Sequence, residues 1–160
     1  MVLDHRGFES LPLRNMKNSN YNALTRSDFD HIIKMNSRWR DMDAIGHLNH
    51  AIYLTYMESA RTDFYVSMGF SSVRKEQDKS IILGGMDIVY LDQCEHPVEL
   101  NICHRVNRVG NKSFDLLGAV FSKTKDHPLC VGLFRMVSFN YNNNHSIPVP
   151  KEVIAHLHQF

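Results

Sequence analysis

The chain has 160 residues, enough for one domain with a sizeable hydrophobic core. Its 18 Lys and Arg residues nearly balance 17 Asp and Glu residues, so the composition predicts no bulk attraction to nucleic acid or to an anionic membrane. No apolar run is long enough to span a bilayer, and no N-terminal segment resembles a secretory signal. The three cysteines lie far apart without metal-type spacing. This predicts free thiols in a reducing compartment, and we expect a cytoplasmic protein.

The N-terminal part of the chain changes character near residue 26. Residues 1–25 show no clear periodicity, and we interpret them as an extension to a single domain over residues 26–160. Phe29–Arg40 alternates imperfectly between apolar and polar residues and predicts the first strand. We expect this strand to give way to a tight polar turn that carries Asp41 and Asp43.

Asn49–Gly69 has the strongest helical pattern in the chain. Its apolar residues recur at steps of three and four positions: Ile52, Tyr53, Tyr56, Met57, Ala60, Phe64 and Met68. Asn49 suits the N-cap because its side chain can accept a hydrogen bond from a first-turn amide. Gly69 suits the position after the helix, where a left-handed residue closes it. We expect a helix of about five turns that a sheet can wrap.

Four further strand patterns follow this helix. They are Ser80–Leu91, Val98–Val109, Lys112–Lys125 and Leu129–Tyr141. Asn142–Pro150 is a polar loop, and Lys151–Phe160 predicts a short helical tail. The order is strand, long helix and then consecutive antiparallel strands, which predicts an α+β fold with about five strands. Open sheet edges favour a sheet that continues into a partner subunit, most simply in a two-fold homodimer.

The turn before the long helix is the best candidate for an active site. A helix start offers free N–H groups and a positive partial charge, which can polarise a carbonyl group. A carboxylate beside it, such as that of Asp43, can attack that carbonyl or activate water. Asp43 alone could equally be a turn or capping residue. We interpret Asp41 as structural, paired with Arg38 or Arg40.

The residues around this turn resemble a known signature. The pattern D-x-D-x-x-G-H-x-N-H-A-x-Y over residues 41–53, followed by Y-x-E-x-A-R over residues 56–61, resembles the signature of hotdog-fold acyl-CoA thioesterases. It is most similar to the 4-hydroxybenzoyl-CoA thioesterase and YbgC-like branch. The resemblance implies a long central helix wrapped by an antiparallel sheet, a homodimer or homotetramer, and active sites at the subunit interface.

The same resemblance implies roles for individual residues. Asp43 falls on the catalytic carboxylate, as nucleophile or general base. The backbone N–H at position 50 would polarise the thioester carbonyl, and the His50 side chain can assist. Asn49 matches the asparagine of the motif, and Tyr53 matches an aromatic residue of the pocket wall. The chain differs from the G-H-V-N-N form of the motif at Leu48 and His50. Thioester hydrolysis of this kind needs no cofactor or metal.

Other residues have both a functional and a structural interpretation. Arg105, Arg108 and Lys112 could contact CoA phosphates, or could be solvated hairpin ends, which is the commoner case. Glu58 could be an auxiliary base, or could pair with Arg61 along the helix. His47 is interpreted as a turn residue that orients Asp43 or the loop backbone. The Gly84–Gly85 pair could let backbone approach the acyl group, or could mark a β-bulge.

The sequence thus favours hydrolysis of an acyl-CoA to CoA and a carboxylic acid, and two alternatives of other classes remain. Asp43, His47 and His50 have a spacing that could hold a metal ion, although it spans a loop-to-helix boundary rather than one helix face. The same fold could instead serve as a non-catalytic acyl-CoA or acyl-carrier-protein binding module. A dehydratase of this fold is a weaker possibility, because it is expected to arrange its histidine and acid differently.

Overall fold

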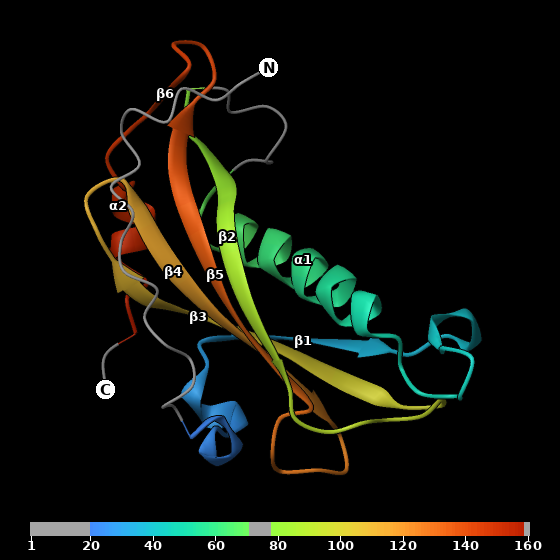
Figure 1. Cartoon of the computed structure of the whole chain (residues 1–160). Coiled ribbons are helices and arrows are strands. Elements are labelled where there is room, and N and C mark those ends of the chain that lie inside the picture. The colour runs from blue at the N-terminus through green and yellow to red at the C-terminus, as the bar shows by residue number, and fades with distance from the viewer. Residues whose placement is uncertain (1–19, 71–77, 159–160) are drawn as a thin grey trace.

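One long helix lies across the concave face of a curled antiparallel sheet (Figure 1). The computed structural model describes residues 20–70 and 78–158. The strands are β1 (His31–Asn36), β2 (Ser80–Tyr90), β3 (Glu99–Val109), β4 (Ser113–Ser122), β5 (Cys130–Asn140) and β6 (His145–Ser146). The helices are α1 (His50–Ser67) and α2 (Lys151–Ile154), with short 3-10 turns η2 (Tyr21–Ala23), η3 (Arg26–Asp28) and η4 (Trp39–Asp41). The predicted α+β class and the long helix are confirmed.

The strand order corrects one expectation from the sequence. Every pairing is antiparallel, but the order is β1-β3-β4-β5-β2, with the short β6 added beside β5. The four later strands are therefore not a simple meander, because β2 pairs with β5 and leaves its other edge without a described neighbour. Strand pairing between distant segments is not encoded in local periodicity, so the sequence pattern could not show it.

Both ends of α1 form as the sequence predicts. The Asn49 side chain accepts a hydrogen bond from the Ala51 N–H at 3.0 Å. At the other end, Gly69 has a φ of +99°, and the N–H groups of Gly69 and Phe70 bond to the carbonyls of Val66 and Tyr65. This pair of bonds is a Schellman closure. The helix is thus fixed at both ends by local sequence.

Two predicted elements are shorter in the structure. The first strand ends at Asn36 rather than Arg40, because Arg38 and Asp41 cap the 3-10 turn η4 instead. The C-terminal helix covers only Lys151–Ile154; beyond it, Leu157 forms a bridge with Val106 of β3. Residues 159–160, also predicted helical, lie outside the described chain, as do residues 1–19 of the predicted extension.

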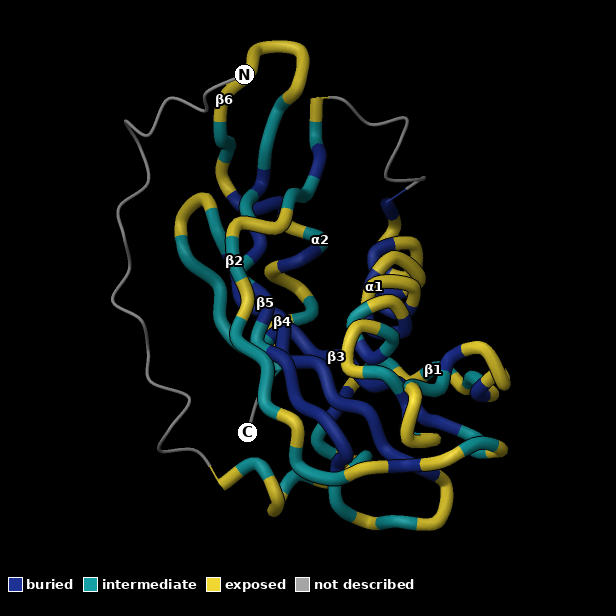
Figure 2. The backbone as a smooth tube through the Cα atoms, turned by 45° about the vertical axis from the view of Figure 1, so that its right-hand side comes forward, coloured by how far each residue is buried: buried dark blue, intermediate teal, exposed yellow. Residues whose placement is uncertain are grey.

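The core has two parts on opposite faces of the sheet. The larger cluster fills the space between α1 and the inner faces of β3, β4 and β5, where Figure 2 shows buried residues concentrated. The smaller cluster, around Phe29, Leu117 and Phe121, lies on the outer face, and Tyr21 and Leu24 pack against it. The end of the predicted extension is therefore part of the packed domain. All three cysteines are buried free thiols. No helix in the described ranges is long and apolar enough to cross a membrane.

Two glycines lie side by side where the sheet packs against this core. Gly118 and Gly132 are cross-strand neighbours on β4 and β5, and the Phe134 ring lies over both. A Cβ added at Gly132 would lie 2.9 Å from atoms of Ile88 and Phe134, closer than real Cβ contacts allow.

We expect Gly132→Ala to destabilise the fold by about 1–3 kcal/mol, because overpacking forces buried groups to shift. Gly85→Ala is the control, since the nearest atom to its added Cβ is the Arg135 guanidinium at 3.6 Å, an ordinary contact. Thermal or urea unfolding of both variants measures the difference. Equal stability of the two variants would contradict tight packing around Gly132.

Candidate active site

Asp41 anchors the loop that carries the candidate catalytic residues. Its side chain is 1% exposed. It accepts hydrogen bonds from the Arg38 backbone N–H at 2.8 Å, from Arg38 Nε at 3.0 Å and from the Tyr56 hydroxyl of α1. Burial alone would raise the pKa of Asp41, but these hydrogen bonds outweigh it and lower the pKa to about 2. Asp41 is therefore an ionised link between η4 and α1, and its partner is Arg38, one of the two predicted arginines.

Asp43 sits two positions further on, at the start of a tight turn. One carboxylate oxygen, Oδ1, accepts hydrogen bonds from the N–H groups of Ile45 at 2.9 Å and His47 at 3.0 Å. The Asp43 N–H donates to the His47 carbonyl at 2.7 Å, which closes the turn. Within the described chain, no hydrogen bond engages the other oxygen, Oδ2. The half-buried carboxylate is thus held by one oxygen and open at the other.

The start of α1 lies directly after this turn. The Asn49 N–H donates to the Asp41 carbonyl at 3.0 Å, so the anchored acid also fixes the helix start. The Asn49 side chain and carbonyl take up the N–H groups of Ala51 and Ile52. The His50 N–H, by contrast, has no hydrogen-bond partner among the residues that the structure places. A free donor with the helix dipole behind it is what polarisation of a carbonyl requires.

Tyr90, at the end of β2, is a site residue that the sequence did not reveal. Its hydroxyl donates to the His50 carbonyl at 3.0 Å, and its ring packs edge-on against the rings of His50 and Tyr53. Tyr53 itself is buried, and its hydroxyl lies 3.7 Å from Cys94 Sγ. The His50 imidazole is exposed beside this aromatic group. A contact across forty sequence positions leaves no local signal, so only the fold could show it.

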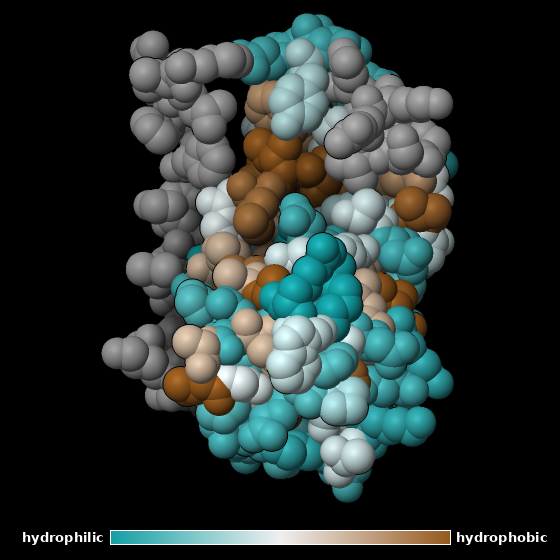
Figure 3. All heavy atoms as spheres, turned by 90° about the vertical axis from the view of Figure 1, so that its right-hand side faces the viewer, coloured by the Kyte–Doolittle hydropathy of each residue, from teal (hydrophilic) through white to brown (hydrophobic). Residues whose placement is uncertain are grey.

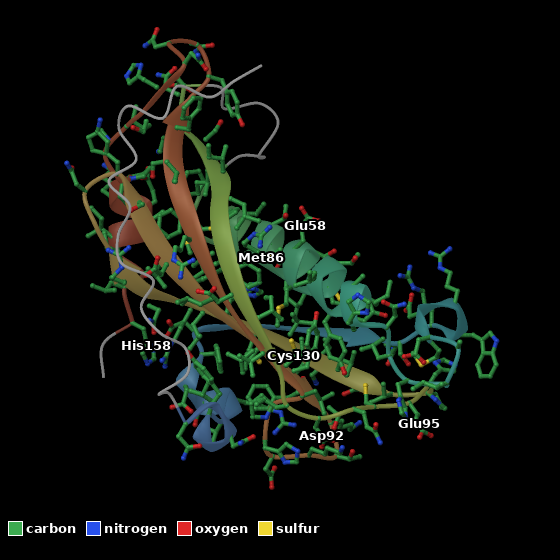
Figure 4. The ribbon with its side chains drawn as sticks, in the orientation of Figure 1. Glu58, Met86, Asp92, Glu95, Cys130 and His158 are labelled. Carbon is green, nitrogen blue, oxygen red and sulfur yellow. The ribbon has the colours of Figure 1, made fainter. Side chains whose placement is uncertain are left out.

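The segment that follows β2 forms backbone contacts with the turn. The Leu48 N–H donates to the Cys94 carbonyl at 2.8 Å, and His47 forms a β-bridge with Glu95. Asp92 belongs to this segment, and Figure 4 shows Asp92 and Glu95 beyond the end of β2. Hydrogen bonds from Lys125 and His127 hold the pKa of Asp92 well below its usual range.

His47 contacts Asp43 through its backbone, which exchanges hydrogen bonds with Asp43. Its imidazole lies 3.9 Å from Glu95, with which it can form an ion pair when protonated. The backbone groups of His47, rather than its ring, orient the carboxylate of Asp43.

The remaining candidates on α1 and β2 have clear structural positions. Glu58 is exposed and lies 3.9 Å from the Arg61 guanidinium, as expected for a pair three positions apart. Figure 4 shows Glu58 on α1 and Met86 on the facing strand β2. The β2 register shifts between Leu83 and Gly85, so Gly84 forms a β-bulge, one of the two possibilities that the sequence left open for the glycine pair.

The basic hairpin is not brought near the turn within one chain. Arg105 donates to the Asp28 carbonyl at 2.8 Å and lies over the Phe29 ring, while Arg108 forms a two-bond pair with Asp115. Lys112 is exposed. β3 starts beside the end of β1, so Arg108 lies about 30 Å further along the sheet at the usual rise per residue. The two arginines make contacts that serve the fold.

The metal hypothesis gains no geometric support. Over the described ranges, no three His, Cys, Asp or Glu side chains lie close enough together to hold a metal ion, and Asp43, His47 and His50 form no such group. Two of the three point to other partners: Asp43 caps its own turn, and the His47 ring faces Glu95.

A curled antiparallel sheet around one long helix, with an acid-bearing turn at the helix start, is the hotdog arrangement of thioesterase-like proteins. The family described as the thioesterase-like superfamily matches residues 37–157, and the chain belongs to that family. Among curated proteins, none matches the chain significantly.

Solved structures with the same fold include two proteins from Pseudomonas aeruginosa. The PA5185 protein of strain PAO1 is 21% identical with a TM-score of 0.74, covering 83% of this chain and 92% of that one. PA2801, a putative thioesterase, is 25% identical with a TM-score of 0.72, covering 78% and 95%. A thioesterase from Thermus thermophilus, complexed with coenzyme A and Zn, is 22% identical with a TM-score of 0.70, covering 81% and 92%.

Proposed function

We propose that this protein is an acyl-CoA thioesterase that hydrolyses an acyl-CoA to CoA and a carboxylic acid, closest to the 4-hydroxybenzoyl-CoA thioesterase and YbgC-like branch. The observation that carries the proposal is the pairing of a half-free carboxylate, Asp43, with a free N–H at the start of α1, that of His50. The family membership and a CoA-bound structural relative support it.

The chemistry follows from these two groups. With Asp43 as general base, Oδ2 takes a proton from water while the water oxygen bonds to the thioester carbon. The carbonyl oxygen gains negative charge, which the His50 N–H stabilises. The tetrahedral intermediate then expels the CoA sulfur, which receives the proton held by Asp43. With Asp43 as nucleophile, its carboxylate bonds to the thioester carbon and the C–S bond breaks, which expels CoA as a thiolate and leaves an acyl anhydride. Water then hydrolyses the anhydride to the carboxylic acid and the Asp43 carboxylate, and the proton released goes to the thiolate. Neither route requires a cofactor.

One observation favours a non-catalytic binding module as the second candidate. The bonds from Ile45 and His47 to Asp43 Oδ1 are those of a purely structural turn aspartate. A panel of aliphatic and aromatic acyl-CoAs, with released thiol detected by a chromogenic reagent, separates the two. Thiol release from any member supports hydrolysis. Tight binding of several members without turnover of any would favour the binding module.

We also propose that two copies pair through β2. The edge of β2 without a described neighbour carries no Lys or Pro to block pairing, and three apolar residues of this strand, Leu83, Met86 and Tyr90, are each more than 40% exposed. Figure 3, seen from the side where α1 begins, shows hydrophobic residues gathered in the upper part of this face. A two-fold pairing would continue the sheet from one chain into the other. A homodimer, or a homotetramer built from it, would then complete each site.

We expect Met86→Lys to shift the protein toward monomers, because a charge on an edge strand opposes pairing. Thiol release per chain should fall with the dimer fraction if each site needs both subunits. Light scattering and activity on the same samples measure this, with the exposed Lys34→Gln as a surface control on the opposite edge strand, β1. A monomer with full activity would show that one chain forms the whole site.

A further inference from the structure

A cleft of about 300 Å³ opens next to η4, on the side of the sheet where β1 ends. Its lining comes from two segments that meet there: Asn36, Ser37, His96, Pro97, Val98 and Glu99. The Ser37 hydroxyl lies 2.8 Å from His96 Nδ1 and accepts the Val98 N–H at 3.0 Å, so the cleft wall is fixed by hydrogen bonds. Its volume is at the lower end for a small-molecule site.

An exposed tryptophan stands at the rim of this cleft. Trp39 is 80% exposed, and its indole packs edge-on against His96 at 5.8 Å between ring centroids. An edge contact leaves a broad face of the indole open. Large aromatic rings with an open face beside a polar cleft are typical platforms for a stacked base.

The cleft lining includes one carboxylate, that of Glu99, which Lys123 Nζ approaches to 3.4 Å, and an arginine beside Trp39 adds positive charge nearby. Arg40 follows Trp39 directly and is exposed, and within the described chain no carboxylate pairs with its guanidinium. Arg38, by contrast, is committed to Asp41. A planar guanidinium without a carboxylate partner is well suited to phosphate. Asn36 adds an amide, the group that pairs with the edge of adenine in many complexes.

We propose that this cleft, with Trp39 and Arg40, binds the adenosine phosphate end of CoA. The inference rests on the proposed function. η4, drawn in turquoise at the right of Figure 1, runs directly into the turn that carries Asp43. A nucleotide stacked on Trp39 can therefore lie beside the site, with the pantetheine arm leading to the start of α1. Arg105 and Arg108, the phosphate candidates from the sequence, have internal partners instead.

The chain offers a direct spectroscopic test, because Trp39 is its only tryptophan. Adenosine 3′,5′-bisphosphate, the nucleotide part of CoA, should quench the intrinsic tryptophan fluorescence on stacking, and CoA should do the same. Pantetheine should not. Quenching that depends on protein concentration but not on nucleotide would overturn the proposal, since it would show that a second copy covers the indole.

Variants give an independent readout by calorimetry with the same bisphosphate. Trp39→Ala should weaken its binding about tenfold, within the range for loss of one stacked base. Arg40→Gln should weaken it several-fold, while Lys112→Gln, an equal change of charge at the basic hairpin, should leave it unchanged. Both Trp39 and Arg40 are exposed, so we expect these variants to fold normally.

The outcomes separate this inference from the proposed function. If thioesters are cleaved and CoA binds, but fluorescence stays constant and Lys112→Gln weakens binding more than Arg40→Gln, the nucleotide lies at the hairpin and the inference fails alone. If neither the bisphosphate nor CoA binds at all and no thioester is cleaved, both fail together. A rise in KM for acyl-CoA in Trp39→Ala, with kcat unchanged and no effect on an acyl-pantetheine, would support it further.

Discussion

Asp43→Asn should lower kcat for thioester hydrolysis by about 10²–10⁴, the usual cost of losing a general base. A lost nucleophile would cost more. An amide cannot take a proton from water at neutral pH, but its oxygen can still accept the N–H groups of Ile45 and His47 that hold Oδ1 in the wild type. The turn should therefore keep its shape, and substrate should still bind.

The measurement is kcat for Asp43→Asn beside its thermal midpoint. We expect a midpoint close to that of the wild type, which separates chemistry from folding. His50→Ala is the second variant. It removes the imidazole but keeps the backbone N–H, so its kcat shows whether the side chain contributes. Activity that persists in Asp43→Asn, within a few-fold of the wild type, would remove this residue from the mechanism.

Asp41→Asn should have the largest effect on stability. The change leaves Arg38 and the Tyr56 hydroxyl without their carboxylate in a site that is nearly closed to solvent. We expect a loss of about 3 kcal/mol, which corresponds to a fall in thermal midpoint of roughly 6–12 °C for a chain of this size. Since the Asp41 carbonyl also holds the start of α1, activity should fall with it.

The same residue predicts a dependence on pH. The pKa of Asp41 lies at about 2 in the folded protein, below its ordinary value of 3.8. A depressed pKa contributes stability that is fully present above the ordinary value and is lost as the pH falls through the folded value. The gap in unfolding free energy between wild type and Asp41→Asn should therefore narrow by about 2 kcal/mol between pH 5 and pH 2. A gap that stays constant across this range would mean that the carboxylate is not the source of the stability.

Much of the fold could be predicted where the signal is local. The helix follows from its periodicity and from Asn49 and Gly69 at its ends, and the Gly84–Gly85 pair made a bulge one of two possibilities. The length of the first strand could not be predicted, because Trp39 and the flanking arginines fit an alternating strand as well as a 3-10 turn. The place of β2 beside β5 depends on pairing between segments about fifty residues apart, which one sequence does not specify.

The candidate site also has parts that the sequence predicts and parts that it does not. The acid-bearing turn, the N-cap and the link from Arg38 to Asp41 lie within a few positions of one another, so their spacing predicts them. Tyr90 reaches His50 only because β2 curls over the helix start, and no pattern in the sequence marks it. The sequence left Arg108 as either a phosphate ligand or a solvated hairpin end, and the strand register places Asp115 opposite it as an ion-pair partner. Whether a charged side chain is available to bind a ligand therefore depends on partners from other strands, which the local sequence does not show.

The most direct test of the central claim is product analysis with the wild-type protein and Asp43→Asn at equal concentrations of folded chain. Each is incubated with every acyl-CoA of the panel that binds to the wild type, and the products are identified by mass spectrometry. We expect equimolar free CoA and carboxylic acid from the wild type, and intact acyl-CoA, bound but uncleaved, with Asp43→Asn. Equal product from both proteins, or acyl-CoA that binds to both and is cleaved by neither, would contradict the account.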